Sequence, residues 1–405
     1  MKKFTVFCSV SAMLFFAAAA HAVQFDTIDP GYSQEIYAAP LVPLEGGMAW
    51  IGSGTGSILL TRAGSNIYEH SLAPNTNYQV SPGPATPLHG VTLTHPISGL
   101  NTTGYGMTNG LDGYIYAVTG SGLQRFNPSN WAAPAQSLAG TAGGAGYGIT
   151  TLSDGRIAYS DGAGVSSNVY IYDPSSGSNT LIYSTSSSSN GQIDGMQGGP
   201  GGVIAVTDRN SFPNFRIDII SNTGSLINSF TTAHAPDGLA FGDGATAPNS
   251  LFSNNNDGTI SRYTLGSGYL GVPLVMDIAQ QTLSNGKAYG DLAAVGPDCA
   301  FYVTQAPNSF NGSTPGVGTH WDNGITTSEA SIVRISAVLQ SPDGTMTPVC
   351  GFYSPTETVP EPGTMSLLLA GFGVLALCTR RVRSALFGRN GGEGQNRVVL
   401  VSDSK

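Results

Sequence analysis

Side chains capable of catalysis are few and scattered along this chain of 405 residues. The histidines beyond the first 22 residues are His70, His89, His95, His234 and His320. None of them has a second histidine at the helix or hairpin spacing that binds a metal ion. No Gly-x-Ser-x-Gly turn presents a serine nucleophile. The triplet His320-Trp321-Asp322 occurs in a long irregular stretch, which indicates a solvated loop, with a sugar-contacting rim as the alternative.

The first 22 residues have the three parts of a secretory signal peptide. Lys2 and Lys3 precede an apolar run from Phe4 to Ala20, and Ala20-His21-Ala22 provides the small residues of a cleavage site at Ala20 and Ala22. We therefore predict export, removal of residues 1–22 and a mature chain that begins at Val23. A retained membrane anchor is the alternative.

A second processing segment, residues 356–383, lies near the other end of the chain. Its first part, Val359-Pro360-Glu361-Pro362, is kept extended and exposed by the two prolines. The apolar stretch from Met365 to Cys378 is only marginally long enough to cross a bilayer of about 30 Å. Arg380, Arg381 and Arg383 follow and would hold its far end on the cytoplasmic side. We predict an exposed processing site next to a transmembrane helix.

These three parts, in this order, resemble the PEP-CTERM sorting signal of exopolysaccharide-producing Gram-negative bacteria. The resemblance runs from Val359 to Arg383 and implies an exosortase, a membrane transpeptidase-like enzyme, as a partner. It also implies a precursor held transiently in the inner membrane and a body delivered to the cell surface or extracellular matrix. Residues 384–405 continue beyond the usual end of such signals as a short tail. An ordinary tail anchor that is never cut is the alternative.

Two of the four cysteines belong to the terminal segments. Cys8 lies in the signal peptide and Cys378 in the apolar stretch, so the body retains Cys299 and Cys350. In an oxidising compartment two such cysteines are expected to pair. Closing a loop of about 50 residues stabilises a fold by roughly 4 kcal/mol in the chain-entropy model. Two unpaired buried thiols are the alternative.

The composition excludes a basic nucleic-acid-binding protein. Charged residues make up 10% of the chain, and between Val23 and Val359 eight basic residues face 22 acidic ones, a formal charge of −14. An acidic surface repels polyanions, so nucleic acids and anionic membrane surfaces are poor partners. Glycine and proline are abundant, with 55 and 24 residues, but stay below the share at which disorder is expected.

The body, residues 23–355, contains a short pattern that recurs six times: a glycine, usually after an aromatic or aspartate, followed by apolar residues. The six glycines are Gly47, Gly106, Gly148, Gly195, Gly238 and Gly290. Their separation of roughly 40–60 residues is the period of propeller blades. Within one repeat, four short strands of residues 148–183 are separated by turns such as Ser153-Asp154-Gly155.

Helical periodicity without a Gly or Pro break is absent from the body. We therefore predict an all-β fold, a six-bladed β-propeller, in which each repeated glycine lies where strands converge on a narrow axis. A pair of β-sandwiches or a right-handed β-helix is the alternative, since the repeats differ in length.

The sequences PDGLAFG at 236–242 and SNNNDGTISRY at 253–263 resemble a blade of the NHL and gluconolactonase-like propellers. Enzymes of the gluconolactonase type hold one divalent cation at the axis with a Glu, Asn and Asp set. The resemblance implies Asp194, Asp237, Asn254 and Asn255 as candidate oxygen ligands for calcium, with Glu45 nearest to the expected glutamate. Turn formation by Asp-Gly and Asn-Gly pairs explains the same residues without a metal ion.

Three functions are compatible with these observations. The first, which we favour, is a non-enzymatic surface or matrix protein that presents propeller loops to polysaccharide or protein. The second is a calcium-dependent hydrolase or lyase of the lactonase type. The third is an assembly role in which the tunnel mouth binds a peptide. An enzyme should gather several ionisable groups at one end of the tunnel, and this body has few.

Overall fold

The computed structural model describes residues 21–38, 47–53, 56–70, 79–81, 88–103, 106–144, 146–161, 167–185, 193–208, 215–280, 288–307 and 331–355. The chain divides into two units, residues 1–357 and 358–405, and all described residues belong to the first. The signal peptide up to Ala20, Glu45, His320 and the whole sorting segment from Val359 to Arg383 lie outside the described residues. Among the described residues no helix is long and apolar enough to cross a membrane.

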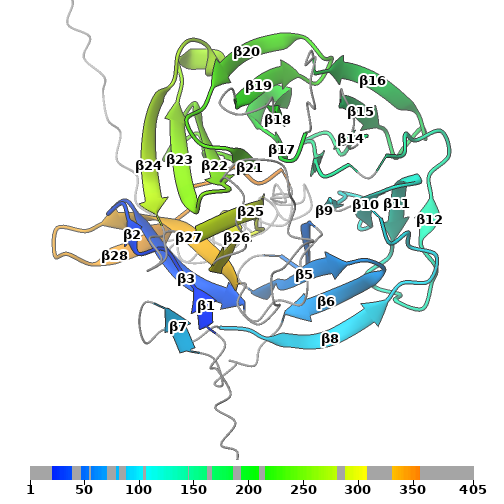
Figure 1. Cartoon of the computed structure of the whole chain (residues 1–405), viewed down its shortest axis with the longest axis horizontal. Helices are drawn as coiled ribbons and strands as arrows, with labels where there is room; N and C mark the ends of the chain where they lie inside the picture. Colours follow the sequence, from blue (N-terminus) through cyan, green and yellow to red (C-terminus); the bar gives the residue numbers. More distant parts are fainter. Residues whose placement is uncertain are drawn as a thin grey trace, which may run out of the picture. The chain divides into compact units, whose positions relative to one another are not determined.

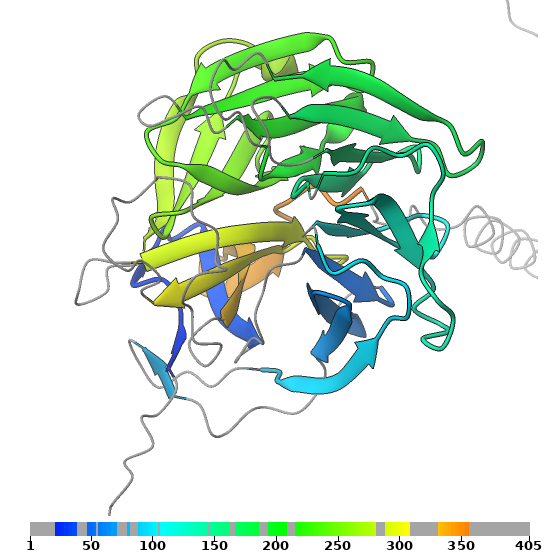
Figure 2. The same cartoon turned by 45° about the vertical axis from the view of Figure 1, so that its right-hand side comes forward.

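Six antiparallel sheets follow one another around a common axis (Figures 1 and 2). Blade 1 consists of β4 (Met48–Ile51), β5 (Ile58–Ala63), β6 (Asn66–His70) and β8 (Val91–Pro96); blade 2 of β9 (Met107–Asn109), β10 (Ile115–Thr119), β11 (Gly122–Phe126) and β12 (Gln136–Ser137); blade 3 of β13 (Ile149–Thr151), β14 (Ile157–Ser160), β15 (Asn168–Tyr172) and β16 (Asn179–Ser184).

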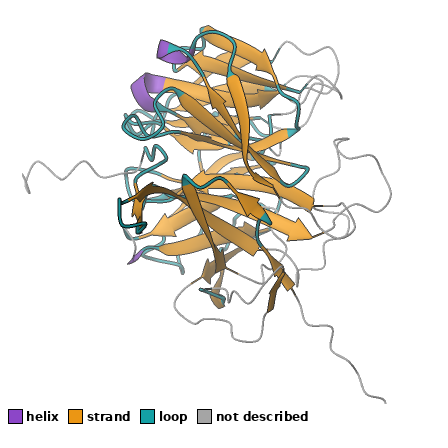
Figure 3. Ribbon diagram, turned by 90° about the vertical axis from the view of Figure 1, so that its left-hand side faces the viewer, coloured by secondary structure: helices purple, strands orange, loops and turns teal. Residues whose placement is uncertain are grey.

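Blade 4 consists of β17 (Met196–Gly198), β18 (Val203–Asp208), β19 (Arg216–Ser221) and β20 (Leu226–Thr231); blade 5 of β21 (Pro236–Phe241), β22 (Ser250–Asn255), β23 (Thr259–Thr264) and β24 (Leu274–Gln280); blade 6 of β25 (Ala288–Val295), β26 (Phe301–Pro307), β27 (Ser331–Gln340) and β28 (Met346–Val349). The regular structure is almost entirely strand (Figure 3), and the described helices, η2 (Pro200–Gly202) and η3 (Ser267–Tyr269), are single turns. The predicted six-bladed propeller is confirmed.

The ring is closed by a strand from the N-terminal end of the body. β3 (Tyr32–Ala38) pairs antiparallel with β27, from Tyr32 opposite Ala337 to Ala38 opposite Ile332, and supplies the outer strand of blade 6. Arg334 of β27 reaches Glu35 of β3 at 2.6 Å. The short β2 (Thr27–Ile28) adds to the outer edge of β24 in blade 5. Strand pairing and an ion pair therefore join the first and last parts of the body, which the repeat pattern did not predict.

A shorter pairing occurs beside the ring. β1 (His21–Val23) runs parallel to β7 (Gln79–Ser81), which lies in the long connection between β6 and β8. Cleavage after Ala22, as the sequence predicts, would leave only Val23 of β1 in the mature chain.

Buried apolar clusters fill the gaps between neighbouring blades. In the part of the chain that the structure describes there are six such clusters, one for each gap. Between blades 2 and 3, for example, Tyr116, Leu123, Ile149, Ile157 and Tyr159 pack together. Because both faces of a blade are covered, inner strands such as β10 are buried at every position and lack the alternation of a one-sided sheet.

The repeated glycines lie where the inner strands of adjacent blades approach each other. A Cβ atom on Gly195 would lie 1.5 Å from the carbonyl oxygen of Asp237 in the next blade, and one on Gly47 would lie 2.2 Å from the amide nitrogen of Met107. Neither contact leaves room for a side chain, because the obstacle is backbone. The predicted convergence of the repeat starts on a narrow axis is confirmed.

Candidate functional site

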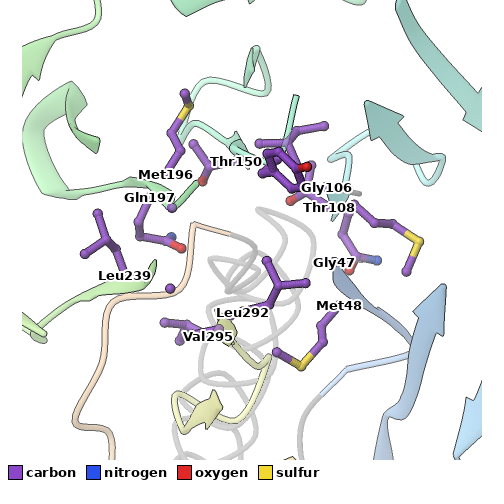
Figure 4. A pocket seen from close by; sticks show the side chains of 18 of the residues that line it. Gly47, Met48, Gly106, Thr108, Thr150, Met196, Gln197, Leu239, Leu292 and Val295 are labelled. Atoms are coloured by element: carbon purple, nitrogen blue, oxygen red, sulfur yellow. The ribbon is translucent and has the colours of Figure 1, made fainter. Parts of the chain in front are cut away.

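The inner strands enclose a pocket at the axis of the ring, which we call the axial channel. Each blade contributes an apolar side chain that follows its repeated glycine, and these are Met48, Met107, Ile149, Met196, Leu239 and Leu292. Figure 4 shows several of them around one opening. The channel offers about 60 Å³ to the centres of water-sized molecules, enough for a few waters, since one ordered water needs ~10–15 Å³. Polar and apolar surface contribute about equally to its wall.

The polar side chains of the channel wall tie neighbouring blades together. Asn109 of blade 2 accepts from the backbone N–H of Trp50 in blade 1 at 2.7 Å and donates to its carbonyl at 2.6 Å. Thr150 of blade 3 accepts from the N–H of Gly198 in blade 4 at 2.9 Å. These bonds link neighbouring blades across the gaps between them. The side-chain amide of Asn109 is therefore already used in stabilising the fold.

The four predicted calcium ligands have different surroundings. Asp194 and Asp237 are both 2% exposed and directly precede a repeated glycine, and Asp194 lines the channel. Asn254 donates to the carbonyls of Leu292 and Thr304 in blade 6 and accepts from Gln305 at 2.7 Å. It thereby connects blade 5 to blade 6.

The side chain of Asn255 stays within its own blade. It donates to Thr259 at 2.9 Å and to Ser261 at 2.8 Å, and accepts from Ser253 at 2.6 Å. Across the described ranges, no group of three or more His, Cys, Asp or Glu residues is arranged to hold a metal ion. The calcium site remains a prediction, with Asp194 as its one member placed in the channel wall.

A charged cluster that the sequence analysis missed lies in blade 5. His234, between β20 and β21, contacts Asp257 through Nδ1 at 2.5 Å and Asp277 through Nε2 at 3.3 Å. Hydrogen bonds to these two carboxylates raise the pKa of His234 to about 10. The hydrogen bond from His234 holds the pKa of Asp277 below its ordinary value. The three residues are far apart in sequence, so no short sequence motif indicates that they form a cluster.

The His234 cluster predicts a specific loss of stability in alkali. Because the pKa of His234 in the folded state lies above its ordinary 6.5, the cluster stabilises the fold fully below pH 6.5, and this contribution disappears as the pH rises towards 10. We expect about 2 kcal/mol of unfolding free energy to be lost, allowing for the exposure of both carboxylates. Urea unfolding at pH 6, 8 and 10 measures it, and His234→Gln should flatten the profile. An equally steep profile in the variant would contradict the assignment.

A second missed cluster ties blade 3 to blade 4. Arg216 lies between the buried carboxylates of Asp208 and Asp218, with Nε 3.0 Å from Asp218 Oδ1. Tyr183 of blade 3 donates to Asp218 at 2.8 Å. Burial raises the pKa of Asp208. A single guanidinium thus neutralises two carboxylates that are almost completely shielded from water. Without the guanidinium, both carboxylates would be buried with no positive charge beside them.

The predicted disulfide is confirmed: Cys299 and Cys350 are bonded, with their Cα atoms 4.9 Å apart. Cys299 lies in the turn after β25, and Cys350 directly follows β28. The chain then continues through Phe352, which is fully buried, to Pro355, which lines the channel. The bridge therefore fixes the C-terminal end of the body close to the axis.

Six sheets of four or five strands around a common axis define this chain as a β-propeller protein. Beyond the propeller, residues 358–383 match the family model described as the PEP-CTERM protein-sorting motif. The chain thus carries the sorting signal that the residues predicted, and that signal implies an exported protein with a membrane-anchored precursor and is the signal for exosortase processing. No curated protein matches the chain.

Similar solved structures include other propeller proteins at low identity. The PQQ-bound aldose sugar dehydrogenase of Streptomyces coelicolor is 11% identical, with a TM-score of 0.46 over 76% of this chain and 99% of its own. Virginiamycin B lyase of Staphylococcus aureus is 13% identical, with a TM-score of 0.44 over 75% of this chain and 98% of its own. Likeness at this level assigns no activity; the fold follows from the sheets of this structure.

Proposed function

We propose that this protein is a non-enzymatic surface or matrix component, delivered by its PEP-CTERM signal, whose propeller binds polysaccharide or another protein. The observation that carries the proposal is the ring of apolar side chains at the axis, one from each blade. Propeller enzymes that act at the axis need ionisable groups or a metal ion there to move protons and stabilise charge. Asp194 is the one carboxylate among the described residues of this channel wall.

Hydrogen bonding in blades 5 and 6 supports the same reading. The amides of Asn254 and Asn255 stabilise strands and turns, so their oxygens would have to leave existing partners to coordinate an ion. Such an exchange costs about 1–3 kcal/mol for each buried group left without a partner. A rigid ring suits a scaffold that presents its connecting loops to a ligand.

Calcium is expected to leave the melting temperature of the mature protein unchanged within about 1 °C. A site occupied at 100 times its Kd would add about 2.7 kcal/mol of stability and raise the melting temperature by several degrees. Differential scanning calorimetry with EDTA and with millimolar calcium measures the difference, and Asp194→Asn is the matched control. A calcium-dependent rise that Asp194→Asn abolishes would overturn the non-enzymatic assignment.

The alternative is a calcium-dependent hydrolase or lyase of the lactonase type. The observation in its favour is the position of Asp194, a buried carboxylate in the channel wall directly before a repeated glycine. In that case a calcium-dependent lactone hydrolysis that Asp194→Asn eliminates would accompany the rise in melting temperature.

A further inference from the structure

The C-terminal end of the body contacts one particular end of the axial channel. The N–H of Phe352 donates to the carbonyl of Cys299 at 3.3 Å, and the N–H of Tyr353 donates to that of Phe241 at 2.8 Å. Phe241 is the last residue of β21, and Cys299 lies in the turn after β25. Pro355 then reaches the channel wall. Phe352 and Tyr353 therefore lie where inner strands end.

The inner strands of the ring run in the same direction. Their repeated glycines lie against the starts of the next inner strands: Gly47 faces Met107, Gly106 faces Tyr147 and Gly195 faces Asp237. The turns that follow the inner strands consequently lie at the other end of the channel. We call the surface formed by these turns, residues 110–114, 152–156, 242–249 and 296–300, the exit face, because Phe352 and Tyr353, near the C-terminal end of the body, form hydrogen bonds there.

The exit face is firmly built. In the turn after β9, Asp112 accepts from Tyr116 at 2.6 Å, and in the turn after β25, Asp298 accepts from Tyr302 at 3.0 Å. The disulfide joins the second of these turns to Cys350. A fully buried Phe352 packs against Phe301 of blade 6 with ring centroids 5.3 Å apart. The last described residues of the body are thus held firmly at this face.

The tether between this point and the processing motif is short. Glu361 is only six residues beyond Pro355, and a fully extended chain covers at most ~3.5 Å per residue, so Glu361 stays within about 20 Å of Pro355. Ligand-binding sites are concave and bury most of the surface of what they bind. An enzyme of ordinary domain size cannot enclose this motif without touching the body.

We propose that the exit face is the surface of the propeller that docks on the processing enzyme, while the face with the starts of the inner strands points away from it. The proposal rests on the proposed delivery by the sorting signal. The partner is a protein surface next to a peptide-binding cleft, and the contact is made by the precursor before the tether is cut.

Site-specific photo-cross-linking of the full-length precursor tests the proposal. Leu111, on the exit face, is 51% exposed, and Thr102, in the connection that leads from β8 to the start of β9, is also exposed. With a benzophenone amino acid at either position, in cells that contain the exosortase, we expect an adduct with the enzyme from position 111 at least tenfold stronger than from position 102. Equal yields, or an adduct from position 102 alone, would overturn the proposal.

Two further measurements distinguish a failure of the docking surface from a failure of the sorting signal. Inserting about a dozen Gly/Ser residues after Glu357 should reduce the adduct at position 111 several-fold, because a flexible linker of that length no longer holds the body against the enzyme. Release of the unsubstituted protein is measured in the same cells. Normal release without any adduct at position 111 would overturn only the docking surface, whereas absence of release would overturn delivery by exosortase and the docking surface together.

Discussion

Replacing Glu361 with alanine is expected to trap the protein in the membrane fraction and to lower the released fraction at least tenfold. Glu361 lies between two prolines that keep the backbone extended and available to an enzyme, inside the matched segment 358–383. Without the motif the apolar stretch that follows would remain attached, and burying each of its CH₂ groups contributes about 0.8 kcal/mol to membrane binding. Cell fractionation with immunoblotting of membrane, surface and medium measures the outcome.

The control for this experiment is Thr364→Ser, which changes a residue inside the matched segment without altering the prolines, the glutamate or the arginines. It should be released like the unchanged protein. Substituting Arg380, Arg381 and Arg383 with glutamine should lower release as well, because their charge holds the far end on the cytoplasmic side. Full release of the Glu361 variant would show that the match does not operate as a sorting signal here.

Placing a charge in the strand that closes the ring is expected to prevent folding of the body. Ile36 of β3 is 2% exposed and lies opposite Val333 of β27 in the sheet of blade 6. Ile36→Asp removes a buried apolar side chain, which costs about 2–5 kcal/mol, and buries an unpaired carboxylate, which costs several more. The sum approaches the total stability of about 5–15 kcal/mol of a typical domain. Circular dichroism and limited proteolysis of the purified protein measure it.

Ser33→Asp provides the matched control, since Ser33 lies in the same strand but is only half-buried. That variant should fold and melt within a few degrees of the unchanged protein. If Ile36→Asp retained a cooperative, protease-resistant body, closure by β3 would not be essential to the ring. The comparison therefore tests the strand itself, independently of any ligand.

Local patterns in the sequence were sufficient to predict the repeat architecture. A glycine is required wherever an inner strand approaches the next blade too closely for a Cβ atom, as at Gly47 and Gly195. Four short strands with turns between them then follow in each repeat. The sorting segment and the pairing of Cys299 with Cys350 were accessible for the same reason: each depends on residue types in a short stretch or on a choice between very few partners.

Other features were decided only by the three-dimensional arrangement. Glu35 and Arg334 are 299 positions apart, so nothing near either residue indicates that β3 completes blade 6. Asn254 and Asn255 suggested metal ligands by type, but the assembled blades occupy their amides with hydrogen bonds.

The sequence by itself determined that this protein is addressed for export and built from six similar sheets, because signals and repeats are contiguous patterns. The tertiary structure decided which strand closes the ring, how His234 meets Asp257 and Asp277, and which end of the inner strands the last residues of the body contact. The physical reason is that contacts between distant residues depend on how the blades pack around the axis, and that packing is a property of the whole ring.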